Sequence, residues 1–139
     1  MIVEFSGKYR FLSNFFMTPI KYDGATYPSV EHAYQAAKFP PQDRHIFWHQ
    51  SLRPGEAKRI GRGKGGPNWH SKSLWIMLDL VRIKFEDPQL RQALLSTGAE
   101  HLEEGNWWGD TFFGVCAGIG HNHLGRILMQ VREEIRNGY

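Results

Sequence analysis

The side chains best suited to chemistry lie in one stretch, residues 29–39, which reads Ser-Val-Glu-His-Ala-Tyr-Gln-Ala-Ala-Lys-Phe. Helical residues at i, i+3, i+4 and i+7 share a face. Four functional groups occupy that spacing here, an acid, a phenol, an amide and an amine: Glu31, Tyr34, Gln35 and Lys38. The alanines and Val30 form a second, apolar stripe. One face of this helix is therefore predicted to pack and the other to meet a polar ligand.

The acid and the amine at the ends of the stripe could act on one bound molecule. Glu31 and Lys38 lie about 10 Å apart along a helix, too far for the i, i+4 ion pair of exposed helices. Phe39 and two prolines follow Lys38, and such an apolar setting would lower its pKa by desolvation and favour a nucleophilic amine. The alternative is a solvated helix face, and the sequence by itself leaves both interpretations open.

Composition bounds the class of protein. The chain has 139 residues, enough for one domain spanning 1–139. Aromatic residues make up 14%, including five Trp, which suggests that some rings line a cleft. A net charge of +3 suits phosphate-bearing ligands. With Cys116 as its single cysteine, no signal-peptide pattern and no long apolar run, the chain is expected to be soluble and cytoplasmic, without membrane contact.

Local signals predict the elements that position the stripe. Pro28 and the capping residue Ser29 start the helix, and the prolines at 40 and 41 stop it after Phe39. Asp23-Gly24 predicts a β-hairpin over 20–27 that leads into this helix. Before it, residues 2–5 are predicted to form a short strand, and the rings and leucine of residues 11–16 are expected to lie mostly in the core.

Further helices follow along the chain. A helix capped by Asp43 should carry Ile46 and Phe47, and a short helix should begin at Pro54 and end at Gly61. Residues 71–85 have apolar residues at near-helical spacing and predict a long core helix that contains Trp75. A helix capped by Asp87 is predicted to begin at Pro88, run through Leu95 and be closed by Gly98, and a last helix is predicted over 124–136. The whole pattern predicts an α+β fold that is mainly helical.

Two irregular segments could bind an anion. Residues 62–66, Arg-Gly-Lys-Gly-Gly, combine cations with exposed backbone amides, although a flexible surface loop explains the same composition. Residues 100–125 mix Trp, carboxylates and glycines and end at a helix N-terminus, whose amides favour anions. His45 with His49, and Cys116 with two histidines, match no standard zinc motif. No metal or cofactor is expected.

Several ordered blocks of this sequence resemble the NADAR or YbiA-like family. They include Phe11-Leu-Ser-Asn-Phe, the segment 27–39, residues 57–62, Trp69, Lys84-Phe85, 104–114 and 118–132. The resemblance covers nearly the whole chain and implies a compact, mainly helical α+β domain with N-glycosidase activity. The substrates it implies carry a phosphorylated ribose on a nitrogen. They are ADP-ribosylated guanine, in a nucleotide, DNA or RNA, or ribosylamino-pyrimidine intermediates of riboflavin synthesis.

The resemblance also implies a set of site residues. Lys38 is expected to form a Schiff base with the opened ribose, and Glu31 to transfer the proton. Asp110 is expected to position the sugar. Substrate binding is expected from the remaining residues of the matching blocks and of the stripe: Asn14, Tyr34, Gln35, Arg62, Trp69, Trp108, Gly109, Gly118, Gly120 and Asn122. Our own hypothesis is that phosphates lie against Arg62, Lys64 and the amides of 118–120, and that Trp108 stacks on the base or ribose.

The sequence departs from the family at two places. Residues 66–69 read Gly-Pro-Asn-Trp where many members have Arg-x-Asp-Trp, and Phe113 stands where Trp is frequent. Two other classes of function are compatible with the sequence. A binding module for ADP-ribose or nucleic acid would use the same loops and rings without catalysing a reaction. In a structural or partner-binding protein, the stripe would be exposed and its mutation would have no effect on function. The sequence does not determine the oligomeric state.

Overall fold

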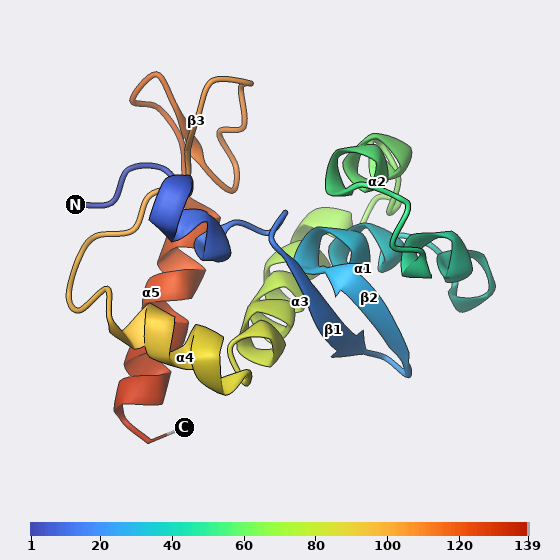
Figure 1. Ribbon diagram of the computed structural model, residues 1–139. Helices are drawn as coiled ribbons and strands as arrows, with labels where there is room; N and C mark the ends of the chain where they lie inside the picture. Colours follow the sequence, from blue (N-terminus) through green and yellow to red (C-terminus); the bar gives the residue numbers. More distant parts are fainter. Residues whose placement is uncertain (139) are drawn as a thin grey trace. The chain divides into compact units, whose positions relative to one another are not determined.

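The computed structural model describes residues 1–138 of the protein. Its backbone forms two compact units, which we describe separately. The central unit is Asn14–Lys84, and the terminal unit combines Met1–Ser13 with the chain from Phe85 onward. Figure 1 follows the elements of both units along the chain. In the described part of the chain, no helix is long and apolar enough to cross a membrane.

The central unit begins with the predicted hairpin. Strands β1 (Met17–Tyr22) and β2 (Ala25–Ser29) pair antiparallel, with Tyr22 opposite Ala25. The two residues between them, Asp23 and Gly24, have φ angles of 50° and 83°. These positive angles are typical of a type I′ turn, whose twist matches that of the flanking strands. The hairpin prediction is therefore confirmed, and β2 leads directly into a helix.

Helix α1 (Val30–Ala36) starts where the sequence predicts. The Ser29 side chain accepts a hydrogen bond from the His32 amide and so caps the first turn. The helix ends three residues before the predicted Phe39, because the Lys38 and Phe39 amides bond to the carbonyls three residues earlier. Such bonds tighten the last turn toward a 3₁₀ geometry. Lys38 therefore lies just beyond α1.

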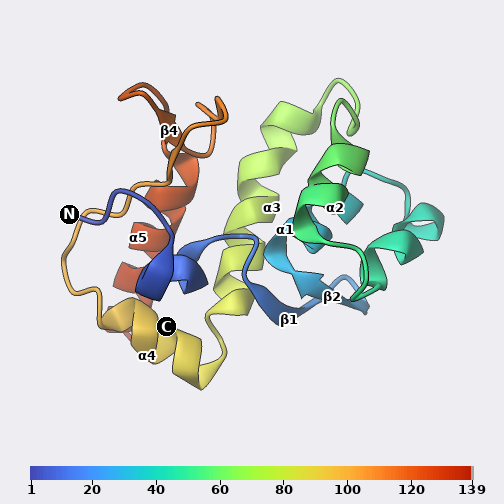
Figure 2. The ribbon, with the colours of Figure 1, turned by 45° about the horizontal axis from the view of Figure 1, so that its top comes forward.

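Two further helices complete the central unit. Helix α2 (Pro54–Gly61) agrees with its prediction, and α3 (Trp69–Lys84) begins two residues earlier than expected. A 3₁₀ helix, η2 (Pro41–Trp48), replaces the helix expected from Asp43, and its N-cap is Pro40. Figure 2 shows α1 lying among the hairpin, α2 and α3. The core of the unit is formed by fully buried apolar side chains: Ile20, Val30, Ala33, Ala36, Phe47, Ala57 and Leu80.

The terminal unit contains helices and short strands. It consists of the 3₁₀ helix η1 (Gly7–Leu12), α4 (Pro88–Leu95), the strands β3 (Gly105–Asn106) and β4 (Val115–Cys116), and α5 (His123–Arg136). The Asp87 carboxylate caps α4 by accepting from the amides of Gln89 and Leu90, as predicted. Strands β3 and β4 pair in parallel over two residues. The core of this unit contains Leu12, Phe85, Leu94, Leu102, Leu124 and Leu128.

Three predictions about packing are wrong. The strand predicted over residues 2–5 is a single β-bridge between Ile2 and Leu102. The aromatic rings of residues 11–16 are only half-buried, whereas Leu12 is fully buried. Trp75, predicted to lie in the core, is 71% exposed, because the buried side of α3 carries Met77, Leu80 and Val81 instead.

Candidate active site

The stripe of α1 is not a solvated helix face. Glu31, Tyr34 and Gln35 are each less than a tenth exposed, and Lys38 is half-buried. Buried polar groups are retained when they have partners or a function, because burial alone is unfavourable. The burial of these side chains therefore excludes a fully solvated helix face, and the catalytic role of the stripe stays a prediction.

Glu31 and Gln35 are joined on consecutive turns of α1. The Gln35 Nε2 atom donates to Oε2 of Glu31 at 2.6 Å, and both residues are buried. The Glu31 amide donates to the Asn14 carbonyl at 3.1 Å, and the Asn14 side chain packs on Met77. Asn14, predicted to bind substrate, thus supports the start of α1. Gln35 thus holds the Glu31 carboxyl group, and Asn14 holds the Glu31 backbone.

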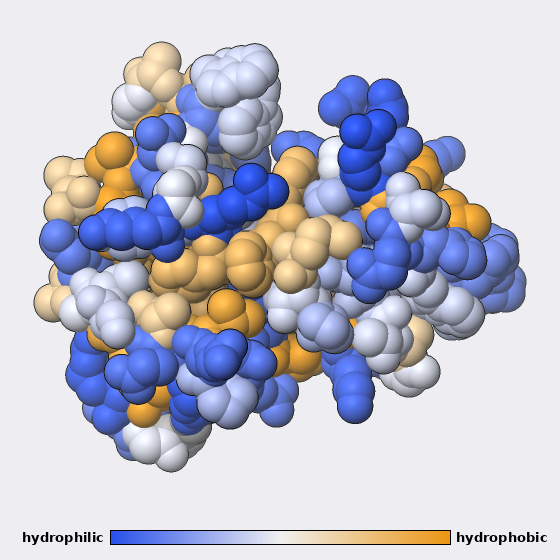
Figure 3. All heavy atoms as spheres, viewed as in Figure 1, coloured by the Kyte–Doolittle hydropathy of each residue, from blue (hydrophilic) through white to orange (hydrophobic). Residues whose placement is uncertain are grey.

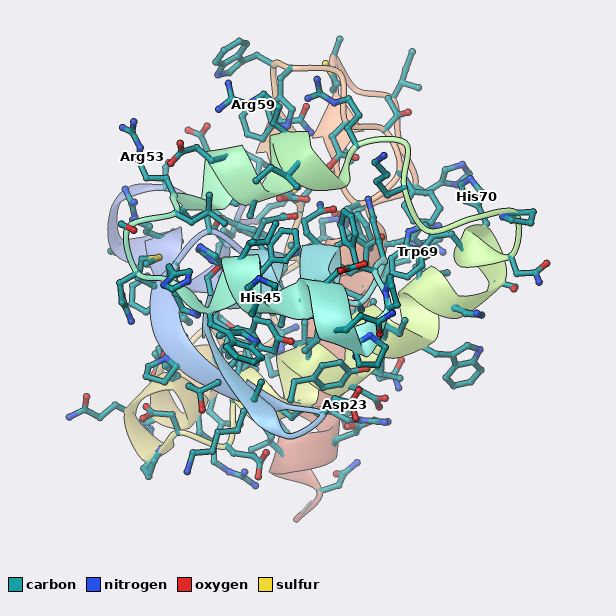
Figure 4. The ribbon with its side chains drawn as sticks, turned by 90° about the vertical axis from the view of Figure 1, so that its right-hand side faces the viewer. Asp23, His45, Arg53, Arg59, Trp69 and His70 are labelled. Atoms are coloured by element: carbon teal, nitrogen blue, oxygen red, sulfur yellow. The ribbon has the colours of Figure 1, made fainter. Side chains whose placement is uncertain are left out.

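The Lys38 amine contacts groups from three elements, two of which are aromatic rings. Its Nζ atom donates to the Gly61 carbonyl at 3.1 Å. The same atom lies 5.5 Å from the centre of the Tyr34 ring and 5.6 Å from that of Trp69, both within cation–π range. Trp69, at the start of α3, donates from Nε1 to the Tyr34 hydroxyl at 3.2 Å, and Figure 4 shows it beside α1.

Burial lowers the pKa of Lys38 from its ordinary value. Desolvation is the largest cause, and the positive charge of Lys58 on α2 acts in the same direction, while the Glu31 carboxylate opposes both. The charge of Glu31 therefore acts on the amine, although the two residues are seven positions apart in the sequence. A lowered pKa increases the fraction of neutral amine, which is the nucleophilic form.

Arg62 follows Gly61 directly and is exposed at the end of α2. Exposed cations continue along this region, with Arg59 before it and Lys64 after it. Figure 3 shows strongly hydrophilic side chains over α2. The arrangement is compatible with phosphate binding, and that role of Arg62 stays a prediction.

The predicted site residues of the terminal unit lie in the segment between α4 and α5. Trp108 is 51% exposed, and its ring packs edge-on against Trp107 with the ring centres 5.6 Å apart. Gly109 has a φ of 87° with open space around it. The Asp110 Oδ1 atom accepts from the amides of Phe112 and Phe113 at about 3 Å and so closes a turn. These contacts shape the loop; substrate roles for its residues stay predictions.

Asn122 and the glycines before it also have structural contacts. The buried Asn122 side chain accepts from the Glu104 amide at 3.0 Å and donates to the Leu102 carbonyl at 3.0 Å. Gly120 packs its backbone against Gly114, whereas Gly118 is open and exposed.

At the start of α5, three amides of the predicted anion site already donate hydrogen bonds to the protein backbone. The amides of Asn122, His123 and Leu124 donate to carbonyls of the preceding loop: Gly114, Phe112 and Phe113. The helix N-terminus is therefore largely satisfied by the protein itself.

Gly61 is the member of the site that the sequence did not identify. The residue was predicted only as the end of α2. Its carbonyl faces Lys38 because the last carbonyls of a helix have no partner within the helix. Within residues 1–138, no group of three His, Cys, Asp or Glu side chains lies close enough to hold a metal ion.

Comparisons with known proteins agree with this architecture. The family model of the NADAR domain matches residues 4–136. N-glycosidase YbiA of Escherichia coli is 38% identical over 138 residues, which cover 94% of this chain and 84% of that protein. The chloroplastic riboflavin biosynthesis protein PYRR of Zea mays is 41% identical over 131 residues, 81% of this chain but 20% of that much longer protein. The NMR structure of E. coli YbiA superposes with a TM-score of 0.83, at 36% identity, over 99% of this chain and 86% of that one.

Proposed function

The chain belongs to the NADAR domain family and is an N-glycosidase of the YbiA type, and from this premise we propose that Lys38 and Glu31 carry out the hydrolysis. The fold is the mainly helical α+β fold of that relative. The observation that carries the proposal is the placement of the Lys38 amine. It is half-buried, desolvated and electrostatically coupled to a buried carboxyl group.

The proposed reaction uses the amine as nucleophile and the acid as proton carrier. Neutral Lys38 attacks the anomeric carbon, the bond from that carbon to the glycosidic nitrogen breaks, and the leaving nitrogen takes a proton delivered by Glu31. The Lys38 nitrogen then gives a proton to the ring oxygen as the bond between that oxygen and the anomeric carbon breaks, which leaves the opened ribose as a Schiff base on Lys38. Water then adds to the imine carbon, the amine leaves, and Glu31 recovers its proton. The net change is one water consumed per glycosidic bond broken.

The aromatic rings have a defined part in this scheme. Tyr34 and Trp69 form one wall beside the Lys38 amine. An apolar wall keeps water away from the nucleophile and sustains the desolvation that lowers its pKa. The hydrogen bond between the two rings fixes their orientation. The scheme therefore assigns Trp69 and Tyr34 to the environment of the amine as well as to substrate binding.

For the substrate we propose ADP-ribosylated guanine, from which the enzyme would release ADP-ribose. Arg62 and Lys64 are exposed cations that closely follow Gly61, the residue that contacts Lys38. Their two charges suit a diphosphate. A second candidate is a ribosylamino-pyrimidine intermediate, because the maize relative is a riboflavin biosynthesis protein. Both candidates carry a phosphorylated ribose on nitrogen.

A side-by-side assay tests both the chemistry and the substrate. Purified protein is incubated with each substrate type, and the products are separated by chromatography for wild type, Glu31→Gln and Lys38→Ala. We expect wild type to consume one substrate and both variants to lose at least about 100-fold in rate, the usual range for a proton carrier or nucleophile. Equal turnover by Lys38→Ala would contradict the proposal.

Borohydride trapping tests the covalent step. Reduction during turnover should add the mass of the opened sugar to the peptide that contains Lys38. The matched control is Lys72→Ala, since Lys72 is exposed on α3, and this variant should trap as wild type does. An adduct that persists in Lys38→Ala, or none in active wild type, would reject the Schiff base.

A further inference from the structure

The Gln35 amide is enclosed between two residues of the site. Its Nε2 atom donates to Glu31, and the residue is only 4% exposed. Its Oε1 atom is fully buried and has no hydrogen-bond partner among the described residues. That oxygen occupies the position which a Cβ at residue 61 would need. Neither end of the amide is therefore open to a ligand, in contrast to the substrate-binding role predicted for Gln35.

Gly61 contacts Lys38 directly and reaches Glu31 only through Gln35. The absence of a side chain leaves room for the Gln35 oxygen, and its carbonyl accepts from the Lys38 amine at 3.1 Å. Its φ angle is not in the positive region, so the backbone conformation does not explain why glycine stands here. Close packing against Gln35 does explain it.

We propose that Gln35 and Gly61 are positioning residues that hold the Glu31 carboxylate and the Lys38 amine in register across the contact between α1 and α2. Gly61 fixes the amine directly through its carbonyl and fixes the acid through Gln35. The inference deepens the function proposed above and rests on it for its catalytic meaning. The contacts themselves can be tested without substrate.

The direction of the amide sets the protonation state that this arrangement favours. An N–H group can only donate, and an ionised carboxylate can only accept. The Gln35 bond therefore stabilises the Glu31 anion, which forms when the acid delivers its proton to the leaving nitrogen. The charges that act on the neighbouring amine are Glu31 on its own helix and Lys58 on α2.

The first test removes the donor while keeping the shape. Gln35→Met should raise the pH midpoint of the Glu31 carboxyl carbon, measured by ¹³C NMR, by about one pH unit, because a hydrogen bond to a charged group is lost. The control is Gln130→Met. Gln130 donates to Glu134 with the same four-residue spacing on the exposed side of α5, and its loss should leave the Glu31 midpoint in place. An unchanged midpoint in Gln35→Met would overturn the inference.

The second test adds the methyl group that the site excludes. Gly61→Ala should lower kcat at least about tenfold with little change in KM, since misplacement of reacting groups affects the chemical step. Gly55→Ala is the matched control, because Gly55 lies in the same helix with open space around it. Equal kcat values for the two variants would contradict the role of Gly61.

A double-variant comparison keeps the inference testable if Gly61→Ala folds poorly. Gln35→Ala removes the amide, so Gly61→Ala should lower the melting temperature less in that background than in wild type. Equal losses in both backgrounds would overturn the proposed contact. If wild type hydrolyses neither substrate, the proposed function fails, whereas the NMR and melting results still decide this inference.

Discussion

Lys84, at the end of α3, should make stability depend on pH in the alkaline range. Its side chain is 3% exposed, with Nζ 5.6 Å from the centre of the Phe16 ring. Burial lowers its pKa to about 7 from the ordinary 10.5. Between these values the unfolded chain binds a proton that the folded chain does not. The free energy of unfolding therefore rises with pH across this window.

The magnitude follows from that difference in pKa. The shift is equivalent to about 5 kcal/mol between the two protonation states at full extent. From pH 7.5 to 9.5 the linkage relation gives a rise in the free energy of unfolding of roughly 2 to 3 kcal/mol. Lys38, whose pKa is also lowered, adds a change of the same sign to every variant that retains it.

Denaturant unfolding of Lys84→Met measures the effect. The variant keeps a long side chain but removes the titrating amine, so its stability should rise less steeply with pH than that of wild type. The control is Lys72→Met, on the exposed side of the same helix, and it should follow wild type. Parallel curves for wild type and Lys84→Met would refute the reasoning.

Three further predictions concern the site and its loop. If neutral Lys38 is the nucleophile, the rate of hydrolysis should increase as pH rises through the lowered pKa of Lys38. Lys58→Ala removes a neighbouring positive charge and so raises the pKa of Lys38. The pH profile of the rate should therefore shift to higher pH in this variant. Trp69→Phe deletes the hydrogen bond to Tyr34 and should cost about 1 kcal/mol in thermal unfolding; no loss would show that the bond is not formed in solution. Asn122→Ala removes two buried hydrogen bonds and should cost about 2 to 3 kcal/mol in denaturant unfolding, whereas the exposed Asn137→Ala should cost little.

Much of the local structure could be predicted because its causes are local. A capping serine, a Pro at the first helical position and an Asp-Gly turn act on their immediate neighbours, so the start of α1, the hairpin and α2 agree with expectation. The side of α3 that is buried could not be predicted, because apolar residues occupy most of its positions. Trp75 was therefore assigned to the wrong side.

The candidate site, too, could be predicted only where its arrangement depends on nearby residues of the chain. The helical spacing of Glu31 and Lys38 predicts their common face, and their electrostatic coupling agrees with it. The proposed role of Gly61 depends on the packing of α2 against α1. No local pattern in the sequence predicts that contact. Gln35 shows the same limit, since only the packed structure reveals that both ends of its amide are enclosed.

The direct passage from β2 into α1 ties the position of the proposed catalytic residues to the hairpin turn. Strand β2 ends at Ser29 and the helix begins at Val30, so no linker residue absorbs a change in length. Each residue added to or removed from the start of a helix rotates the rest by about 100°. An insertion near Asp23 that shifted the strand pairing would turn the acid and the amine away from their present contacts with α2 and α3, although Asp23 itself lies outside the helix. Natural length variation in this protein should therefore be found outside the 17–38 segment.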